Sequence, residues 1–338
     1  MHVYAVTPQA PGPDDTSGSG YAGLLAETAD ACERAGWSGI LVPHNLHEVD
    51  PWLITGQLGQ AAERLVPLVA VQPASAPPHT VAAMAAAFAV LYGRPLDFNL
   101  VAGAREDERR QTGDLLDHDE RYARLREYGM ILRALLRGEE VTMAGRFYSY
   151  DRFRLVPRPD VLSRSRLFVA GSSPASISVA QEIADVVVTH PTPFAEWSES
   201  FLKPLVAGGY TGGLGIRVGV VADSRRERAW TEAERRFPET WQGRQETLLK
   251  TVSSNRWARD LAVRSVDAQE RPDRSDPYWL GAFRSGKASA PFFVGTHEEV
   301  GERLGDYVRA GIDHILLNGC HEADYHDIGR AIAIASKS

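Results

Sequence analysis

The sequence contains little cysteine, no excess of basic residues and no long hydrophobic run. Its two cysteines, Cys32 and Cys320, are too few for a disulfide framework or a four-ligand zinc site. The 37 Lys and Arg residues face 44 Asp and Glu residues, and a net charge of −7 excludes a broad nucleic-acid surface. The longest nearly apolar run, residues 81–92, is far shorter than the roughly 20 residues that span a bilayer. Because a basic and apolar leader is also missing, we expect a soluble, cytoplasmic protein.

Short β-rich runs alternate with amphipathic segments along most of the chain. The runs are nearly continuous in apolar residues, which is typical of parallel strands buried on both faces. Eight such runs are His2–Val6, Gly39–Val42, Leu68–Val71, Phe98–Val101, Leu167–Ala170, Asp185–Val188, Ile216–Val221 and His314–Leu317. Helical patterns between them include Tyr21–Ala35, Trp52–Arg64, Thr80–Leu91, Arg121–Arg137, Pro174–Ala184 and Glu298–Ala310. This order predicts an α/β fold, a (β/α)8 TIM barrel, with a doubly wound open sheet as the alternative.

Two segments exceed a minimal barrel. Residues 138–166 alternate and carry aromatics, which predicts a hairpin inserted after the fourth helix. Residues 225–291 begin as a charged helix and continue through a stretch rich in Gly, Pro and Ser, for which we expect a mobile lid near residues 262–291. Since no Pro- or Gly-rich linker divides the chain, we expect a single domain over residues 1–338.

The active site of such a barrel lies at the carboxyl ends of its strands, which selects candidate residues directly. The candidates combine polar side chains with backbone positions where a strand ends. They are His44 and His47 after the second strand, Gln72 after the third, Asn99 on the fourth, Gly171, Ser172 and Ser173 after the fifth, His190 after the sixth, Arg217 on the seventh and Cys320 after the eighth.

The segment LFVAGSSPASIS ends a strand in Gly-Ser-Ser-Pro and begins a helix. Free N–H groups and two hydroxyls at a helix start form an anion site, and barrels often bind phosphate at such loops. The alternative is an ordinary capped helix, because serine is a favoured N-cap and proline suits the first turn. The GxxxxGK[ST] pattern of a P-loop is missing.

The histidines and arginines each allow two interpretations. His44 and His47 lie in HNLHE, a spacing unlike the usual zinc motifs, so we expect no metal. Their open interpretations are a substrate-polarising or general-base role and a structural, hydrogen-bonded one. Arg217 interrupts an apolar strand, where it faces the barrel mouth or forms a salt bridge at the strand end. Arg284 is a solvated lid charge or a cation that closes on an anion.

A succession of motifs covers nearly the whole chain. It runs through DPWLITGQL, ERLVPLVAVQPASAPPHTVAAMAAAFAVL, GRPLDFNLVAGA, LDHDERYARLREY, GRFYSYDRFRLVPRP, LFVAGSSPASISVAQEIADVVVTHPTP, GIRVGVVAD, FRSGKASAPFFVGT and RAGIDHILLNG. In order and spacing, these segments resemble the bacterial luciferase-like flavin-dependent monooxygenases. The alkanesulfonate monooxygenase branch is the closest in pattern.

This resemblance implies a two-component monooxygenase. Reduced FMN (FMNH2) would come from a separate NAD(P)H:flavin reductase and react with O2 to a flavin C4a-(hydro)peroxide, which oxidises a small organic or natural-product substrate. Asn99 would face the flavin ring, while His118 and Tyr122, with Gly171, Ser172 and Ser173, would hold the 5′-phosphate. Arg217 and Arg284 would stabilise the peroxide or an anionic substrate. Relatives of this kind form homodimers or homotetramers.

Three substrate-side positions depart from the sulfonate branch. Glu48 stands where that branch has cysteine, Gly219 where it has histidine and Cys320 where it has tyrosine. The pattern indicates retained flavin use and a changed substrate, contacted by His47, Gln72, His190 and Cys320, with His44 near a functional histidine of the luciferases. Sulfonate cleavage, hydroxylation, Baeyer–Villiger oxidation and N-oxidation stay open. The alternatives are hydride transfer with coenzyme F420 and flavin binding without catalysis.

Overall fold

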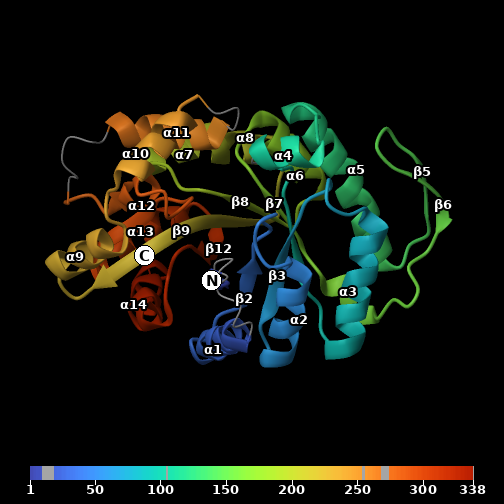
Figure 1. Cartoon of the computed structure of the whole chain (residues 1–338), viewed down its shortest axis with the longest axis horizontal. Helices are drawn as coiled ribbons and strands as arrows, with labels where there is room; N and C mark the ends of the chain where they lie inside the picture. The colour runs from blue at the N-terminus through green and yellow to red at the C-terminus, as the bar shows by residue number, and fades with distance from the viewer. Residues whose placement is uncertain (10–18, 104–105, 253–255, 268–273, 338) are drawn as a thin grey trace. The chain divides into compact units, whose positions relative to one another are not determined.

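The eight strands expected from the sequence form a closed parallel barrel in the computed structural model, which describes residues 1–9, 19–103, 106–252, 256–267 and 274–337 (Figure 1). The strand order is β9-β12-β1-β2-β3-β4-β7-β8, and β9 also pairs with β8, which completes the ring and confirms the (β/α)8 fold. The bounds are β1 (His2–Val6), β2 (Gly39–Val42), β3 (Val66–Val71), β4 (Asp97–Leu100), β7 (Leu167–Ala170), β8 (Val186–Thr189), β9 (Gly213–Asp223) and β12 (Ile312–Leu317). Strands β2, β4 and β8 are buried along their whole length, which explains the apolar runs of β2 and β8, while β4 also buries the polar Asp97 and Asn99.

Helices follow most of the strands and end where their capping residues predict. The long helix α5 begins after Asp117, which forms a capping box with Glu120, and stops at Gly138, whose φ is 82°. The α-helices are α1 (Ser19–Arg34), α2 (Pro51–Ala61), α3 (Pro78–Tyr92), α4 (Glu106–Thr112), α5 (His118–Arg137), α6 (Pro174–Ile183), α7 (Phe194–Trp197), α8 (Lys203–Ala207), α9 (Arg226–Arg236), α10 (Trp241–Lys250), α11 (Arg256–Asp267), α12 (Gly281–Arg284), α13 (His297–Arg309) and α14 (Tyr325–Ala335). Shorter turns are η1 (Asp160–Arg164), η2 (Ser198–Leu202) and η3 (Glu322–Asp324). Among the helices of the described ranges, none has the length and apolar character needed to cross a membrane.

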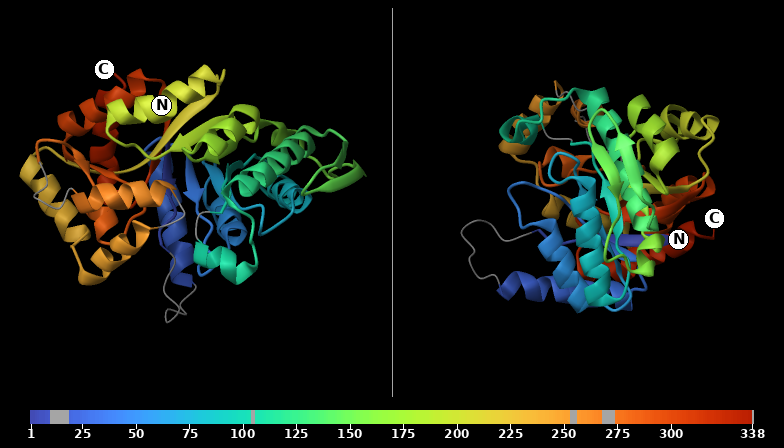
Figure 2. Two further views of the ribbon diagram at one scale, coloured as in Figure 1. Left: turned by 90° about the horizontal axis from the view of Figure 1, so that it is seen from above. Right: turned by 90° about the vertical axis from the view of Figure 1, so that its right-hand side faces the viewer.

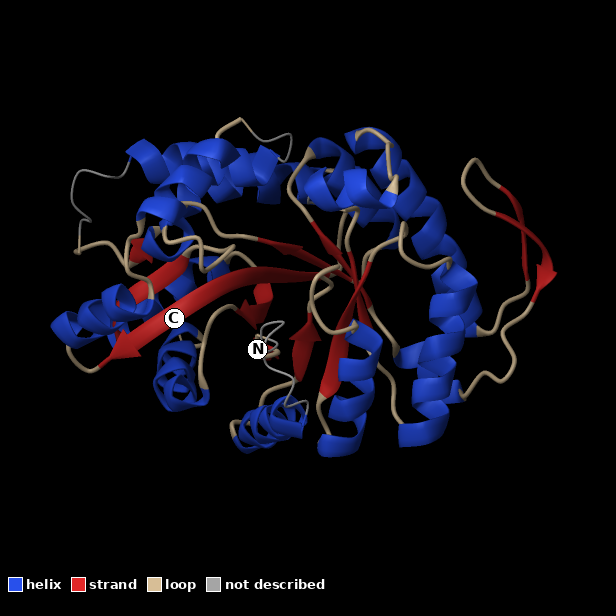
Figure 3. Ribbon diagram, in the orientation of Figure 1, coloured by secondary structure: helices blue, strands red, loops and turns tan. Residues whose placement is uncertain are grey.

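The contacts within the chain define two compact units, the first of which combines residues 7–187 with residues 205–212. It contains the expected hairpin, formed by β5 (Val141–Ala144) and β6 (Ser149–Phe153), which pair antiparallel beside α5 (Figure 3). The carboxylate of Glu127 on α5 accepts hydrogen bonds from the backbone N–H groups of Arg146, Phe147 and Tyr148 at 2.9, 2.9 and 3.3 Å. The half-buried carboxylate of Glu127 therefore holds the turn of the hairpin against α5.

The other unit comprises residues 1–6, 188–204 and 213–338. Here β9 continues beyond the barrel and pairs in parallel with β11 (Phe292–Thr296), which in turn pairs antiparallel with β10 (Tyr278–Trp279). Helices α10, α11 and α12 pack on one another in the same unit (Figure 2).

The segment expected to be a mobile lid contains short regular elements in its described part. It contains the end of α11, then β10 and α12, and it buries Trp279, Leu280 and Phe283, which are 5%, 4% and 1% exposed. The Gly-, Pro- and Ser-rich composition concealed these few apolar anchors, and the mobility expected of this lid stays a prediction. Residues 268–273 of the expected lid lie outside the described residues.

Candidate active site

The junction between β7 and α6 is shaped by a glycine and a serine cap. Ser173 is the N-cap of α6, and its Oγ accepts a hydrogen bond from the N–H of Ser176 at 3.2 Å. Gly171 has a φ of 145°, and a Cβ built there would lie 2.7 Å from the hydroxyl of Tyr122 and 2.7 Å from the Cβ of Ser176. The backbone thus needs glycine here, and it approaches α5 too closely for any side chain. The capped-helix interpretation is confirmed, and it leaves the start of α6 with the geometry of an anion cradle.

Helix α5 supplies the other side of this cradle. The Tyr122 hydroxyl donates to the carbonyl of Ala170 at 3.5 Å, and its ring packs against that of His118 with centroids 5.0 Å apart. Burial raises the pKa of Tyr122, so its hydroxyl stays a hydrogen-bond donor at neutral pH. His118 lies 2.7 Å from a carboxylate oxygen of Asp119. The structure therefore brings together four of the predicted phosphate residues, with Ser172 between Gly171 and Ser173 in the chain.

Two further arginines, Arg109 and Arg121, lie in the same unit and were not predicted. A Cβ built at Gly103 would lie 3.4 Å from the Cδ of Arg109 and 3.9 Å from the Cδ of Arg121. The Nε atoms of both side chains are buried without a hydrogen-bond partner in the described part of the chain. Desolvation and the neighbouring Arg109 charge lower the pKa of Arg121. Two crowded cations with unused donors indicate an anion site, and nothing in the sequence around them signals it.

Asn99 lies on β4, opposite Phe168 of β7 in the sheet register, and is 9% exposed. Its side-chain oxygen Oδ1 is buried and has no hydrogen-bond partner within the described ranges. Because native proteins rarely leave a buried acceptor unpaired, this oxygen marks a place where a ligand N–H is missing. The position suits the flavin-ring contact expected for Asn99, and Gly171 follows the same strand β7.

His44 and Gln72, both predicted from strand ends, contact each other. The amide Nε2 of Gln72 donates to Nδ1 of His44 at 3.2 Å, and Nε2 of that ring lies 3.3 Å from the hydroxyl of Ser75. These neighbours assign the proton of a neutral His44 ring to Nε2. His47 is exposed in the turn that follows, where its backbone N–H bonds to Asn45. The structure thus joins two of the three predicted residues and leaves His47 apart.

Arg217 lies on β9 in the other unit. Its Nη2 donates to Oδ1 of Asn318, at the end of β12, at 2.9 Å, while its buried Nε has no partner in the described residues. No carboxylate pairs with it within the part of the chain that is described. Burial lowers the pKa of Arg217 to about 10, so the guanidinium still carries its charge at neutral pH. The salt-bridge interpretation is therefore not observed, and the partner of Arg217 is Asn318, which the rule on strand ends also selects after the eighth strand.

His190 is held next to Arg217. Its Nδ1 lies 3.2 Å from the backbone carbonyl of Arg217, which assigns the ring proton to Nδ1. The indole of Trp257 on α11 stacks on the ring, with centroids 3.8 Å apart and planes at 24°. Burial and the Arg217 charge lower the pKa of His190 to about 3. A neutral His190 offers Nε2 as a hydrogen-bond acceptor, and Trp257 is a site residue that sequence reasoning missed.

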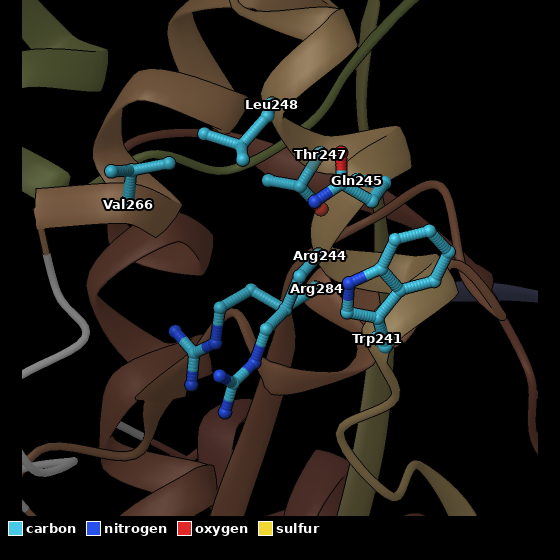
Figure 4. Close-up of a pocket in the computed structure, with 7 residues that line it drawn as sticks. All are labelled: Trp241, Arg244, Gln245, Thr247, Leu248, Val266 and Arg284. Carbon is cyan, nitrogen blue, oxygen red and sulfur yellow. The ribbon is translucent and has the colours of Figure 1, made fainter.

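Arg284 ends α12 and is not the solvated charge that one interpretation expected. Its side chain is only 12% exposed. It lines a cavity of about 300 Å³ with Trp241 and Arg244 of α10 (Figure 4). The structure therefore favours the second interpretation, a cation available to an anion.

The sequence profile of the luciferase-like monooxygenases matches residues 1–314. The chain belongs to this family. A relative from Niallia circulans, named 4-(gamma-L-glutamylamino)butanoyl-[BtrI acyl-carrier protein] monooxygenase BtrO, is 33% identical over 309 residues, which cover 90% of this chain and 88% of the relative. This luciferase-like monooxygenase is thus an oxidoreductase, as the motif succession indicated.

Solved structures of low sequence identity share the fold of the monooxygenase. EDTA monooxygenase (EmoA) from Chelativorans sp. BNC1 superposes with a TM-score of 0.72 at 14% identity, covering 100% of this chain and 94% of the other. The coenzyme F420-dependent tetrahydromethanopterin reductase from Methanopyrus kandleri does so with a TM-score of 0.67 at 12% identity, covering 97% and 96%. Both likenesses concern the fold alone.

The monooxygenase has a physical reason for glycine where the sulfonate branch has histidine. A Cβ built at Gly219 would lie 2.3 Å from the ring of Phe292, which β11 places over β9. Phe292 is fully buried and packs against Phe237, with ring centroids 4.8 Å apart. The volume that a histidine needs is therefore filled by a phenyl ring.

Cys320 and Glu48 occupy the other two positions that differ from the sulfonate branch, and neither has the surroundings of a catalytic residue. The Cys320 thiol donates weakly to the carbonyls of Val220 and Asn318 at 3.7 and 3.6 Å, and burial raises its pKa to about 12. It stays a neutral thiol, which excludes a nucleophilic role at neutral pH. Glu48 is exposed and accepts a hydrogen bond from Asn45 Nδ2 at 2.9 Å.

The depressed pKa of His190 predicts a loss of stability in mild acid. The unfolded chain binds a proton on this ring near pH 6.5, whereas the folded ring resists protonation to about pH 3, so the free energy of unfolding falls as the pH drops through this window. From pH 6.5 to 5 we expect a loss of about 2 kcal/mol, at 1.36 kcal/mol per unit. His190→Gln should flatten that slope in urea denaturation. The same slope in His190→Gln and in the exposed-residue control His326→Gln contradicts the assignment.

Proposed function

We propose that this monooxygenase uses reduced FMN from a separate NAD(P)H:flavin reductase and O2 to oxygenate an acyl group carried on an acyl carrier protein. One oxygen atom enters the substrate and the other leaves as water, with two electrons taken from the reduced flavin. The cradle at Gly171 and Ser173 is the observation that carries the flavin part of the proposal. The acyl substrate is supported by the named activity of the relative BtrO.

The residues of the first unit fit a flavin mononucleotide. Ser172, Ser173 and the Tyr122 hydroxyl would bind the phosphate at the start of α6, with His118 beside them. The unpaired Oδ1 of Asn99 would accept a hydrogen bond from an N–H of the isoalloxazine ring, and the buried charges of Arg109 and Arg121 favour an anion in this unit. The bound flavin would supply the electrons that activate O2. A helix start and charged donors together fit a phosphate dianion.

Arg217 would stabilise negative charge on oxygen during the reaction. Its charge persists up to a pH near 10, its Nε is unused, and Asn318 fixes one edge of its guanidinium. Such preorganised donors contribute most when they are desolvated. His190 would accept a hydrogen bond from the substrate through Nε2, because its other nitrogen is occupied by the Arg217 carbonyl.

His44 and Gln72 would contact the substrate as a hydrogen-bonded pair, with His47 and Cys320 as weaker candidates. The reaction on the acyl group would be hydroxylation, N-oxidation or Baeyer–Villiger oxidation. We also propose that residues 1–338 act as one luciferase-like domain in a homodimer or homotetramer. A coenzyme F420-dependent hydride transfer is the second candidate, favoured by the shared fold of the Methanopyrus reductase.

Anaerobic titration separates the candidates. We expect reduced FMN to bind more tightly than about 100 μM, and the enzyme with O2 and a carrier-bound 4-(γ-glutamylamino)butanoyl thioester to add one oxygen atom to the acyl group by mass spectrometry. If reduced FMN does not bind, the proposal is overturned. Turnover with reduced F420 and without O2 selects the second candidate.

The same titration tests the phosphate cradle. Ser173→Ala should weaken reduced FMN by roughly 1–3 kcal/mol, the range for a hydrogen bond to a charged group. Loss of the N-cap also costs about 1 kcal/mol of folding stability. Thr296→Ala is the matched control, since Thr296 caps α13 in the same way through the N–H of Glu299. Equal FMN affinity of the Ser173→Ala and Thr296→Ala variants would place the phosphate elsewhere.

A further inference from the structure

The cavity between α10 and α12 contains more positive charge than its acidic partner neutralises. Nη2 of Arg244 lies 2.8 Å from Oε2 of Glu239, and Nε of Arg284 lies 4.0 Å from Oε1 of the same carboxylate. In Figure 4 the two guanidinium groups point the same way from neighbouring elements. Among the described residues, one carboxylate therefore pairs with both guanidinium groups, which leaves one positive charge over.

Two residues that line this cavity each contain a buried polar atom that forms no hydrogen bond within the described residues. These atoms are Nε of Arg284 and Oγ1 of Thr247, and Thr247 is 2% exposed. A buried donor that stays unpaired costs roughly 1–3 kcal/mol, and most native donors are satisfied. Both residues belong to the wall of one cavity, beside an excess of positive charge among the described residues, and this combination favours an anionic group with acceptor oxygens there.

The position of Arg284 is fixed by close packing and does not depend on a flexible loop. A Cβ built at Gly243 on α10 would lie 2.5 Å from the carbonyl oxygen of Arg284, so the two backbones touch. Thr240 caps α10 by accepting from the N–H of Gly243 at 3.0 Å. The backbone that carries the Arg284 side chain is thus held in place, which lowers the entropy lost when this residue binds an anion.

The mouth of the cavity is apolar and accessible. Trp241 is 77% exposed and Leu248 is 49% exposed, and both belong to α10 and line the cavity. The remaining wall includes Val266 of α11. A ligand that fits must therefore join an anionic group to an alkyl segment and reach the surface of the protein.

Contacts lead from this cavity to the Arg217 centre within the same unit. Phe283, which precedes Arg284, packs edge-on against Trp257 with centroids 6.4 Å apart. Trp257 stacks directly on His190, whose Nδ1 bonds the Arg217 carbonyl. A ligand held in the cavity thus lies against the helices that position His190.

We propose that this cavity binds the phosphate of the pantetheine arm on which a carrier protein presents the acyl group. The proposal rests on the proposed carrier-bound substrate. The phosphodiester of such an arm carries one negative charge, which matches the one excess guanidinium charge, and its flanking alkyl groups suit Trp241 and Leu248. A single arginine can bind two phosphate oxygens through two parallel hydrogen bonds. Because the phosphate is attached at the carrier surface, it needs a site that opens to solvent.

Calorimetric titration of the full chain with 4′-phosphopantetheine and with pantetheine tests the proposal without flavin or O2. At constant ionic strength we expect the phosphorylated compound to bind at least 10-fold more tightly. Arg244→Gln and Arg284→Gln should each abolish most of this preference. The control Arg235→Gln should retain it, because Arg235 is exposed and pairs with Glu232 on α9.

Equal affinity for the two compounds, or a preference that survives both cavity substitutions, overturns the phosphate site. Hexanoate that competes with 4′-phosphopantetheine as strongly as inorganic phosphate does would also overturn the phosphate site, since that result assigns the cavity to a carboxylate. The outcome is separate from that of the proposed function. A phosphate preference without FMN binding contradicts the flavin proposal alone, while oxygenation without this preference contradicts the cavity proposal alone.

Discussion

Replacing Arg217 by methionine should lower kcat/KM for oxygenation by at least about 100-fold, the usual cost of removing one donor that stabilises an anionic oxygen. The free energy of unfolding should change by less than about 2 kcal/mol. Methionine removes a desolvated charge that lacks a carboxylate, which offsets the loss of its hydrogen bond to Asn318. The measurements are product formation by mass spectrometry and urea denaturation of the same preparations.

The pH dependence distinguishes a charge effect from a merely structural one. Wild-type activity that depends on the charged guanidinium should decline only as the pH approaches 10, because burial places the Arg217 pKa there. Arg217→Lys should lose activity at lower pH, since a buried ammonium releases its proton more easily. Unchanged kcat/KM in Arg217→Met, or identical pH profiles of the lysine variant and the wild type, contradicts the assignment.

Restoring the histidine of the sulfonate branch at position 219 should destabilise the protein by about 3 kcal/mol or more. The new side chain would collide with the Phe292 ring, which already lies 2.3 Å from the position of a Cβ. Overpacking of a core usually costs 1–3 kcal/mol, and a whole imidazole exceeds one methylene by far. Urea denaturation of Gly219→His measures the loss.

A double-mutant cycle identifies the cause. Phe292→Ala alone should cost about 3–5 kcal/mol by leaving a cavity. The double variant Gly219→His with Phe292→Ala should be more stable than the sum of the two losses predicts, because the imidazole occupies the vacated volume. Additive losses would show that the two residues do not compete for the same space.

The barrel was predictable because most of its strands have a local signal in the sequence, a short run of apolar residues. Runs such as Gly39–Val42 are buried on every side, so apolar continuity alone locates them. The hairpin at 138–166 also followed from its alternation. The burial within the expected lid did not, because Trp279 and Phe283 are isolated apolar residues in a polar segment and their partners lie on α9 and α11. Packing between distant segments leaves no periodic pattern.

The candidate site shows the same limit. The rule on strand ends selected His44, Gln72, Asn99 and the cradle at Gly171. The structure adds the hydrogen bond between the first two, the unpaired oxygen of Asn99 and the close packing at Gly171. Side chains that reach a site from helices carried no such signal. Arg121 sits in an ordinary charged helix start, and Trp257 in a charged helix, yet one has an unused buried donor and the other stacks on His190.

The state of the two thiols has a consequence for the lifetime of the enzyme. Proteins that bring reduced flavin together with O2 encounter hydrogen peroxide, and the thiolate is the form of cysteine that peroxide oxidises. Burial raises the pKa of Cys320 to about 12, so its thiol stays protonated at pH 7. Cys32 is fully buried. Under the proposed function, the chain therefore presents almost no reactive thiolate to its own by-product, and turnover should proceed without progressive self-inactivation through cysteine sulfenic acid.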